Sequence, residues 1–120
     1  MNAVRKVLLV EDEVLVAALA VDALEELGYQ TIEATTAKGA RELARDAQFA
    51  FAVIDVGLPD GRGDALALEL RRAQADLPIV IATGYDGAHV DEKLRAQPRT
   101  AVLSKPYDIG QMRTAIQSIL

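Results

Sequence analysis

The sequence predicts an α/β domain built on an open, doubly wound parallel sheet of five strands. Five short apolar runs recur along the 120 residues, and stretches with helical periodicity separate them. Strict alternation of strands and helices gives a parallel sheet with helices on both faces. Five strands are too few to close an eight-stranded barrel, so the sheet is expected to be open. Residues 1–120 are expected to form a single domain, because a typical domain has about 100 to 150 residues.

The predicted strands are the apolar runs at residues 7–10, 31–34, 51–54, 79–82 and 101–103. Four of these runs are continuously apolar, which is typical of strands that are buried on both faces. The run Thr31-Ile32-Glu33-Ala34 alternates between apolar and polar residues, so we expect it at an edge of the sheet.

Helices are expected over residues 13–27, 36–47, 63–75 and 88–97, and from residue 108 onward. The first helix is predicted to end at Gly28, because a glycine after a helix adopts the left-handed conformation at little cost. The last is predicted to begin at Asp108, which forms the pattern of a capping box with Gln111. The helix at 88–97 has the weakest amphipathic pattern of the five.

The composition excludes several classes of protein. Acidic residues number 18 against 13 basic ones, and this net charge of −5 disfavours binding to nucleic acid. The absence of cysteine excludes a disulfide scaffold, thiolate catalysis and a Cys-ligated metal site. No apolar run approaches the roughly 18 residues of a membrane span, and none resembles a signal peptide. We therefore expect a cytoplasmic protein that does not interact with membranes.

Polar side chains follow four of the predicted strands, where ligands of such sheets bind. Glu11 and Asp12 follow the first strand, Asp55 the third, Thr83 the fourth and Lys105 the fifth. Carboxylates in this proximity repel one another unless a cation shares the site. Hard oxygen ligands from few residues suit Mg²⁺, which keeps several waters. The sequence thus predicts an acidic Mg²⁺ pocket in which Glu11 and Asp12 hold the metal.

Asp55 is the best candidate for a nucleophile in this pocket. It follows a buried strand and precedes a loop with Gly57, Pro59 and Gly61, which can bend closely around a ligand. A carboxylate beside Mg²⁺ and a lysine can attack phosphorus, because the cations screen its repulsion from the incoming anion. The product would be an aspartyl phosphate. Lys105 would pair with one phosphate oxygen, and the Thr83 hydroxyl would donate to another.

Four motifs, each at the end of a predicted strand, together resemble the receiver domain of two-component response regulators over essentially the whole chain. They are Glu11-Asp12, Asp55 to Pro59 with Gly63 eight residues after the aspartate, Thr83-Gly84 and Lys105-Pro106. The resemblance implies a flavodoxin-like strand order of 2-1-3-4-5. It also implies Mg²⁺ bound by Asp12, Asp55 and the Gly57 carbonyl, with Glu11 acting largely through water, and a cis peptide bond before Pro106.

The resemblance further implies a phosphorylation-controlled switch. A histidine kinase or phosphotransfer protein would transfer a phosphoryl group to Asp55, and the domain would signal through protein contacts or onward phosphotransfer. Such a domain is not an enzyme with an external substrate, since it catalyses only its own phosphorylation and dephosphorylation. We expect a free-standing receiver; a receiver fragment of a larger regulator or hybrid kinase would have the same sequence features. A receiver-like interaction module that is not phosphorylated is the alternative class.

Two departures from the usual receiver pattern concern switching. Val102 occupies the position where many receivers have the Tyr or Phe that changes rotamer on phosphorylation. The run 81–85 resembles the signature of the FAT GUY subfamily of receivers, with Ile81 in place of Phe. We therefore expect contact between Thr83 and the phosphoryl group to order the loop at 84–88. Tyr85 is a candidate for limiting water access to the site.

The first helix carries a second apolar face next to the expected site, formed by Val14, Leu15, Ala18 and Val21. An exposed apolar patch at this place favours a docking surface for the helical bundle of a kinase or phosphotransfer protein. Scattered surface aliphatics, which are common in soluble proteins, are the alternative interpretation.

Overall fold

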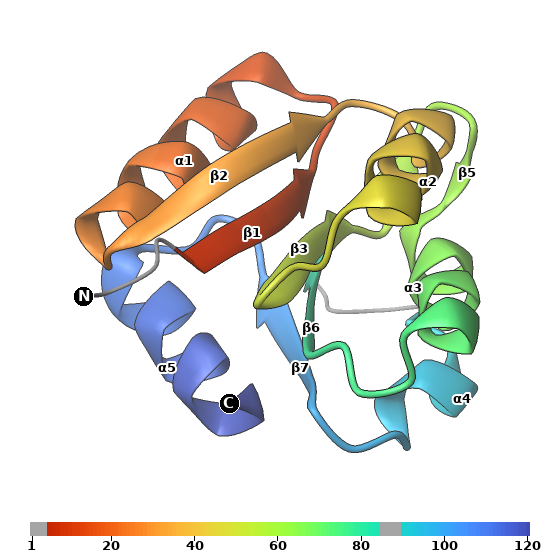
Figure 1. Ribbon diagram of the computed structural model, residues 1–120. Helices are drawn as coiled ribbons and strands as arrows, with labels where there is room; N and C mark the ends of the chain where they lie inside the picture. The colour runs from red at the N-terminus through yellow and green to blue at the C-terminus, as the bar shows by residue number, and fades with distance from the viewer. Residues whose placement is uncertain (1–4, 85–89) are drawn as a thin grey trace.

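The computed structural model describes residues 5–84 and 90–120 and has three layers (Figure 1). A five-stranded parallel sheet has the order β2-β1-β3-β6-β7, which is 2-1-3-4-5 when its strands are counted along the chain. Its strands are β1 (Arg5–Val10), β2 (Tyr29–Ala34), β3 (Phe51–Asp55), β6 (Ile79–Thr83) and β7 (Thr100–Ser104). The predicted fold class and strand order are confirmed.

Helices cover both faces of the sheet (Figure 1). They are α1 (Val14–Glu26), α2 (Ala37–Asp46), α3 (Gly63–Ala73), α4 (Glu92–Arg95) and α5 (Ile109–Ile119). α1 and α5 pack on one face, where Leu24, Phe51 and Met112 belong to one buried cluster. α2, α3 and α4 pack on the other, where Ile54, Leu66 and Leu94 belong to a second. Within the described ranges, none of the helices has the length and apolar character required to cross a membrane.

Each predicted strand lies inside an observed one, and β2 is at an edge as its alternating pattern indicates. The continuous apolar run of β7 is misleading, because β7 forms the other edge of the sheet and, among the described strands, pairs with β6 alone. Val102 is 37% exposed there, whereas its neighbour Leu103 is buried. The exposure of side chains on β7 is therefore determined by its position at the edge of the sheet, and the apolar sequence pattern does not predict it.

Apart from α4, each observed helix begins and ends within two residues of the predicted bounds. α4 has four residues, beginning at Glu92 after Asp91, whose side chain accepts a hydrogen bond from the Lys93 amide. Part of the predicted helix at 88–97, together with Tyr85 and all but Gly84 of the predicted switch loop, lies outside the described residues. α5 begins after Asp108 with the expected capping box to Gln111.

A short hairpin between β3 and α3 is not predicted from the sequence. It consists of β4 (Gly57–Leu58) and β5 (Gly61–Arg62), which pair antiparallel directly after Asp55. Asp60 in its turn accepts hydrogen bonds from the backbone amides of Ala37 at 2.8 Å and Lys38 at 3.0 Å. The hairpin is thereby attached to the N-terminus of α2.

Gly63 joins this hairpin to α3 at a point of close backbone approach. A Cβ at position 63 would lie 1.8 Å from the backbone oxygen of Asp55, so a larger residue would displace the chain. The Gly63 amide donates to the carbonyl of Val56 at 2.8 Å. The glycine eight residues after Asp55 thus permits α3 to begin directly against the end of β3.

The exposed apolar face of α1 differs from the predicted one at a single residue. Val14 and Leu15 are 82% and 80% exposed, and Ala18 is exposed as well. The prediction for Val21 is wrong: it is partly buried and packs against the core cluster beneath α1 and α5. Val21 lies four residues after the buried Ala17, on the same side of the helix. Leu19, which is 67% exposed and four residues after Leu15, belongs to the exposed face instead.

Candidate functional site

Three carboxylates meet at the carboxyl edge of the sheet. β1 and β3 are neighbours, with Val10 paired to Ile54, so Glu11 and Asp55 follow side by side. Glu11, Asp12 and Asp55 each have a carboxylate oxygen within 4.8 Å of the other two. Glu11 and Asp55 are buried, whereas Asp12 is exposed. The predicted grouping of these carboxylates is present in the fold.

Lys105 reaches the same place from the end of β7. Its peptide bond to Pro106 is cis, as the resemblance implies. The Lys105 amide donates to the carbonyl of Thr83 at 2.8 Å, which joins the ends of β7 and β6. The Lys105 ammonium lies 3.0 Å from Asp55 Oδ1 and 3.4 Å from Glu11 Oε1. An ion pair between Lys105 and Asp55 therefore joins the ends of β7 and β3, which are far apart in the sequence.

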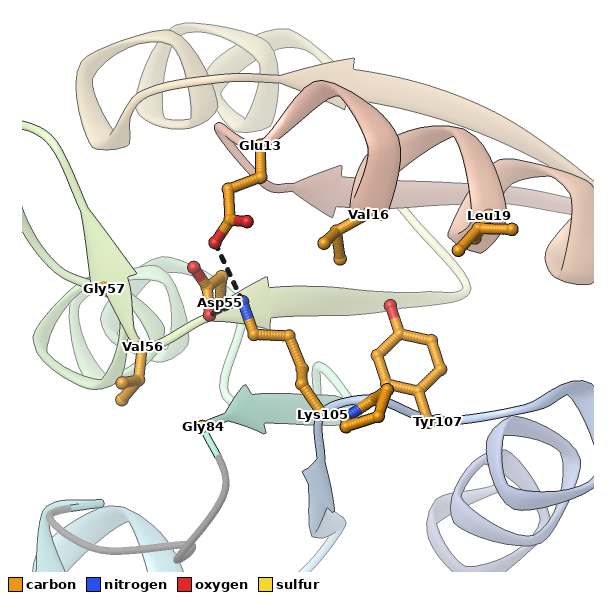
Figure 2. Close-up of a pocket in the computed structure, with 10 residues that line it drawn as sticks. Glu13, Val16, Leu19, Asp55, Val56, Gly57, Gly84, Lys105 and Tyr107 are labelled. Carbon is orange, nitrogen blue, oxygen red and sulfur yellow. Dashed lines mark ion pairs between the residues drawn. The ribbon is translucent and has the colours of Figure 1, made fainter.

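Glu13 also contacts Lys105, although it is absent from the predicted site. Its Oε1 lies 3.7 Å from the Lys105 ammonium, and Figure 2 shows its side chain extending from the start of α1 toward Lys105 and Asp55. The backbone amide of Glu13 donates to Glu11 Oε2 at 3.1 Å. The available signal in the sequence is the run Glu11-Asp12-Glu13, in which a third carboxylate follows the acidic pair.

The electrostatics of the site reflect this crowding. Burial raises the pKa of Glu11, and the neighbouring Asp55 charge acts in the same direction. The Glu13 amide and Lys105 lower it, but the net pKa of Glu11 lies above its ordinary value. Burial lowers the pKa of Lys105, yet hydrogen bonding and attraction to Asp55 and Glu11 raise it overall. Lys105 is therefore a permanent cation that only partly balances the carboxylates around it.

The donor set fits a Mg²⁺ ion. Carboxylate oxygens are the hard ligands that this cation takes, and its positive charge would relieve the repulsion among Glu11, Asp12 and Asp55. The exposed Asp12 leaves one side of the group open to water, which a Mg²⁺ ion retains in its coordination shell.

Thr83 and Gly57, the other two predicted site residues, lie at the same edge. Asp55 pairs with Ala82 in the sheet, so Thr83 comes one residue further along β6, where it is buried. Gly57 begins the hairpin after Asp55 and lines a pocket with it. All the predicted site residues are thus at the carboxyl ends of β1, β3, β6 and β7.

The pocket beside Asp55 has a volume of about 440 Å³. One side is lined by Asp55, Gly57, Gly84 and Lys105, and the other by apolar groups that include Val16, Leu19 and Tyr107. In Figure 2 the Tyr107 ring lies below Val16 and Leu19, at the apolar side of the pocket. Burial raises the pKa of Tyr107 to about 12, so its hydroxyl stays protonated. An acidic centre and an apolar groove therefore adjoin in one cavity.

Comparisons with known proteins agree with this geometry. Residues 7–117 match the family described as the response regulator receiver domain. The chain is 32% identical over 116 residues to the sensor kinase CckA of Brucella abortus and covers 12% of that protein. It is 31% identical over 112 residues to the photosynthetic apparatus regulatory protein RegA of Rhodobacter capsulatus, covering 61% of it. The chain thus spans only part of these two relatives.

A third relative has about the same length as this chain. The response regulator receiver protein CpdR of Brucella abortus is 27% identical over 116 residues, which are 97% of both chains. Among solved structures, the chemotaxis protein CheY4 of Vibrio cholerae superposes with a TM-score of 0.87 at 24% identity, covering 98% of this chain and all of that one. A CheY-like receiver domain from Methylobacillus flagellatus gives 0.85 at 27% identity with the same coverage.

Proposed function

Because the chain belongs to the family of response regulator receiver domains, we propose that it is a phosphorylation-controlled switch that accepts a phosphoryl group on Asp55 in a Mg²⁺-dependent reaction. The position of Asp55 is the observation that carries this proposal. Its carboxylate is buried at the end of β3, 3.0 Å from the Lys105 ammonium and grouped with Glu11 and Asp12. A nucleophile with a fixed cation beside it, in an acidic group suited to Mg²⁺, fits phosphoryl transfer.

The reaction is a substitution at phosphorus. A carboxylate oxygen of Asp55 forms a bond to phosphorus while the bond from phosphorus to the donor's imidazole nitrogen breaks. The released nitrogen keeps the bonding electron pair. Lys105 pairs with an oxygen of the transferring group, and the Thr83 hydroxyl donates to another. Water reverses the modification by attacking the same phosphorus, which restores the carboxylate and releases inorganic phosphate.

Glu11, Asp12, Asp55 and the Gly57 carbonyl are the groups that we propose to hold Mg²⁺. When bound, the ion neutralises negative charge on the phosphoryl oxygens and on the carboxylates. Asp12 would provide an exposed ligand, and the buried Glu11 would act largely through water. Asp55 is both a ligand and the nucleophile, which brings the attacking oxygen next to the positive charge.

The proposed phosphodonor is a histidine kinase or a phosphotransfer protein. The exposed apolar face of α1, formed by Val14, Leu15, Ala18 and Leu19, adjoins the pocket through Leu19. Apolar side chains at helical spacing are suited to packing against another helix. A donor helix that rests on this face would carry its phosphohistidine toward Asp55. Signalling would then proceed through contacts with a further protein or by onward phosphotransfer.

Intact-mass measurement tests the phosphorylation directly. After incubation with acetyl phosphate and Mg²⁺, the wild-type chain should gain the mass of one phosphoryl group. Asp55→Asn should gain none, since an amide is a far weaker nucleophile, and a chelator should greatly slow the reaction of the wild type. No adduct from acetyl phosphate or from any of a panel of histidine kinases would favour the interaction module that is not phosphorylated.

A separate experiment tests the docking face. Val14→Gln combined with Leu15→Gln should slow transfer from a kinase while leaving transfer from acetyl phosphate near the wild-type rate, because both side chains are exposed, neither lines the pocket beside Asp55, and only the protein donor needs the apolar contact. Leu120→Gln is the matched control, since Leu120 is an exposed leucine on another part of the surface. Equal slowing with both donors would contradict a docking role.

A further inference from the structure

Glu13 differs from the other carboxylates of the site in its exposure. Its side chain is 64% exposed, whereas the side chains of Asp55 and Glu11 are 6% and 3% exposed. Glu13 precedes the first turn of α1, and its side chain accepts no capping hydrogen bond there. Its carboxylate instead lines the pocket above Asp55 and Lys105 (Figure 2). A small phosphodonor that approaches Asp55 through the pocket therefore passes close to Glu13.

The charge of Glu13 is not balanced within the site. The Lys105 ammonium is closer to Asp55, at 3.0 Å, and to Glu11, at 3.4 Å, than to Glu13, at 3.7 Å. One positive charge is thus shared by three carboxylates. The proposed metal would offset Asp12, Asp55 and Glu11, but Glu13 is not among its proposed ligands. An exposed negative charge therefore persists at the mouth of the pocket in the reactive state.

From this arrangement, we propose that the Glu13 carboxylate is a specificity-determining charge that discriminates among phosphodonors by their negative charge. This inference rests on the proposed function, since it concerns the reaction at Asp55. An exposed carboxylate lowers the local concentration of a dianion more than that of a monoanion, because Coulomb repulsion scales with the donor's charge. Acetyl phosphate is a dianion at neutral pH, whereas phosphoramidate and phosphorylated imidazole carry less negative charge. The favoured substrate class is therefore a phosphorylated nitrogen donor.

Initial rates of phosphorylation, measured by intact mass with Mg²⁺ present, test the proposal. The probes are acetyl phosphate and phosphoramidate, and the variants are Glu13→Gln and the charge reversal Glu13→Lys. With acetyl phosphate at low salt we expect Glu13→Gln to react about threefold faster than wild type, and Glu13→Lys faster still. The increase in rate with phosphoramidate should be smaller. Salt of about 0.5 M should bring the ratio of variant to wild-type rate close to one with both donors.

Glu26→Gln is the control, because it removes the same charge from the opposite, exposed end of α1 and should leave both rates unchanged. A gain of equal size with both donors would overturn the proposal, as would a gain that persists at high salt or an unchanged rate for Glu13→Gln. If wild type forms no adduct with either donor, the proposed function fails and this inference fails with it. An adduct with an unaltered donor preference overturns this inference alone.

Discussion

Arg71 near the amino ends of β6 and β7 and Lys105 at the carboxyl end of β7 are both largely buried cations, but their partners differ. Arg71 donates to the carbonyls of Leu77 and Arg99 at 3.0 and 2.7 Å. It also donates to the side chains of Gln97 and Thr100 at 2.8 and 2.7 Å. None of these four acceptors is a carboxylate. Lys105, by contrast, lies within 4 Å of three carboxylates.

This difference separates a structural end of the sheet from the end that we propose to be reactive. The four acceptors around Arg71 satisfy a buried guanidinium and connect α3 to the segment before β7, so the charge stabilises the fold. Around Lys105 the negative charges outnumber the positive one, and this excess supports the proposed binding of a metal ion and a phosphoryl group there. Changes at the first end should reduce stability, and changes at the second should chiefly alter binding and reactivity.

Replacing Arg71 should have the largest effect on stability. Arg71→Met would remove the donor to the Leu77 carbonyl and one of two donors to the Arg99 carbonyl, which also accepts from the Ile79 amide at 2.9 Å. Because the bonds to the Gln97 and Thr100 side chains are lost as well, we expect the free energy of unfolding to fall by about 3 kcal/mol. Arg71→Lys should lose less, because an ammonium keeps some of the hydrogen bonds. Urea denaturation measures both values. A loss below about 1 kcal/mol for Arg71→Met would contradict the structural role.

Asp64 shows that a carboxylate near the reactive edge is stabilising when it has enough donors. It is buried, and it accepts hydrogen bonds from Arg62 at 2.9 and 3.0 Å and from the Asp91 amide at 2.8 Å. Burial alone would raise its pKa, but the hydrogen bonds from Arg62 and Asp91 outweigh burial and hold the pKa below the ordinary 3.8. Asp64 thus resembles Arg71 and contrasts with Glu11.

Asp64→Asn should therefore lower the free energy of unfolding by about 2 kcal/mol at neutral pH. Because the folded pKa of Asp64 is depressed, its contribution is present above pH 3.8 and is lost as the pH falls through the folded value. The difference between wild type and variant should accordingly shrink in acid. Denaturation at a series of pH values checks this, with the exposed Asp46→Asn as control. A difference that grows as the pH falls would contradict the assignment.

Magnesium should stabilise the fold through the acidic group. At a concentration of ten times Kd, binding to the folded state adds about 1.4 kcal/mol to the free energy of unfolding, following RT ln(1 + [Mg²⁺]/Kd). Asp12→Ala should largely abolish this dependence, since Asp12 is the exposed member of the predicted ligand set. Thermal unfolding over a Mg²⁺ titration measures the effect. If Mg²⁺ stabilised Asp12→Ala as much as wild type, the ion would bind at a site other than the acidic group.

The smallest expected change in the free energy of unfolding is an increase, and it concerns the replacement of Glu11. Because the folded pKa of Glu11 is raised, its contribution to stability is present below pH 4.5 and is lost as the pH rises through the folded value. Glu11→Gln should therefore be more stable than wild type at neutral pH without metal, by less than about 1 kcal/mol. Denaturation in a chelating buffer gives the sign. If Glu11→Gln were clearly less stable than wild type at neutral pH, the Glu11 carboxylate would stabilise the fold as Asp64 does, which would contradict this prediction.

The sheet and the central acidic group were predictable because local patterns determine both. Four of the strands contain a short continuous apolar run, β2 alternates between apolar and polar residues, and parallel strands bring their carboxyl ends to one edge. Glu11, Asp55 and Lys105 therefore converge once the strand order is known. The hairpin at Gly57–Leu58 and Gly61–Arg62 was not predictable, because two-residue strands are too short to show a periodic pattern.

Residues whose roles depend on distant partners were also missed. Arg71 has the sequence context of a surface arginine on an amphipathic helix, and only the tertiary fold brings the carbonyl of Arg99 to it. Glu13 meets Lys105 because α1 begins at the edge of the sheet where β7 ends, which spacing along the chain does not specify. Leu19 rather than Val21 belongs to the exposed face because the side of α1 that carries Val21 packs against the core cluster.

Locating the modified residue tests the central claim most directly. The wild-type chain would be incubated with acetyl phosphate and Mg²⁺, reduced with borohydride, which converts an aspartyl phosphate to homoserine, and digested for peptide mass mapping. We predict homoserine at position 55 and none in the Asp55→Asn variant. Homoserine at another aspartate with residue 55 unmodified, or none at all, would contradict the assignment of Asp55 as the phosphoacceptor at the reactive end of the sheet.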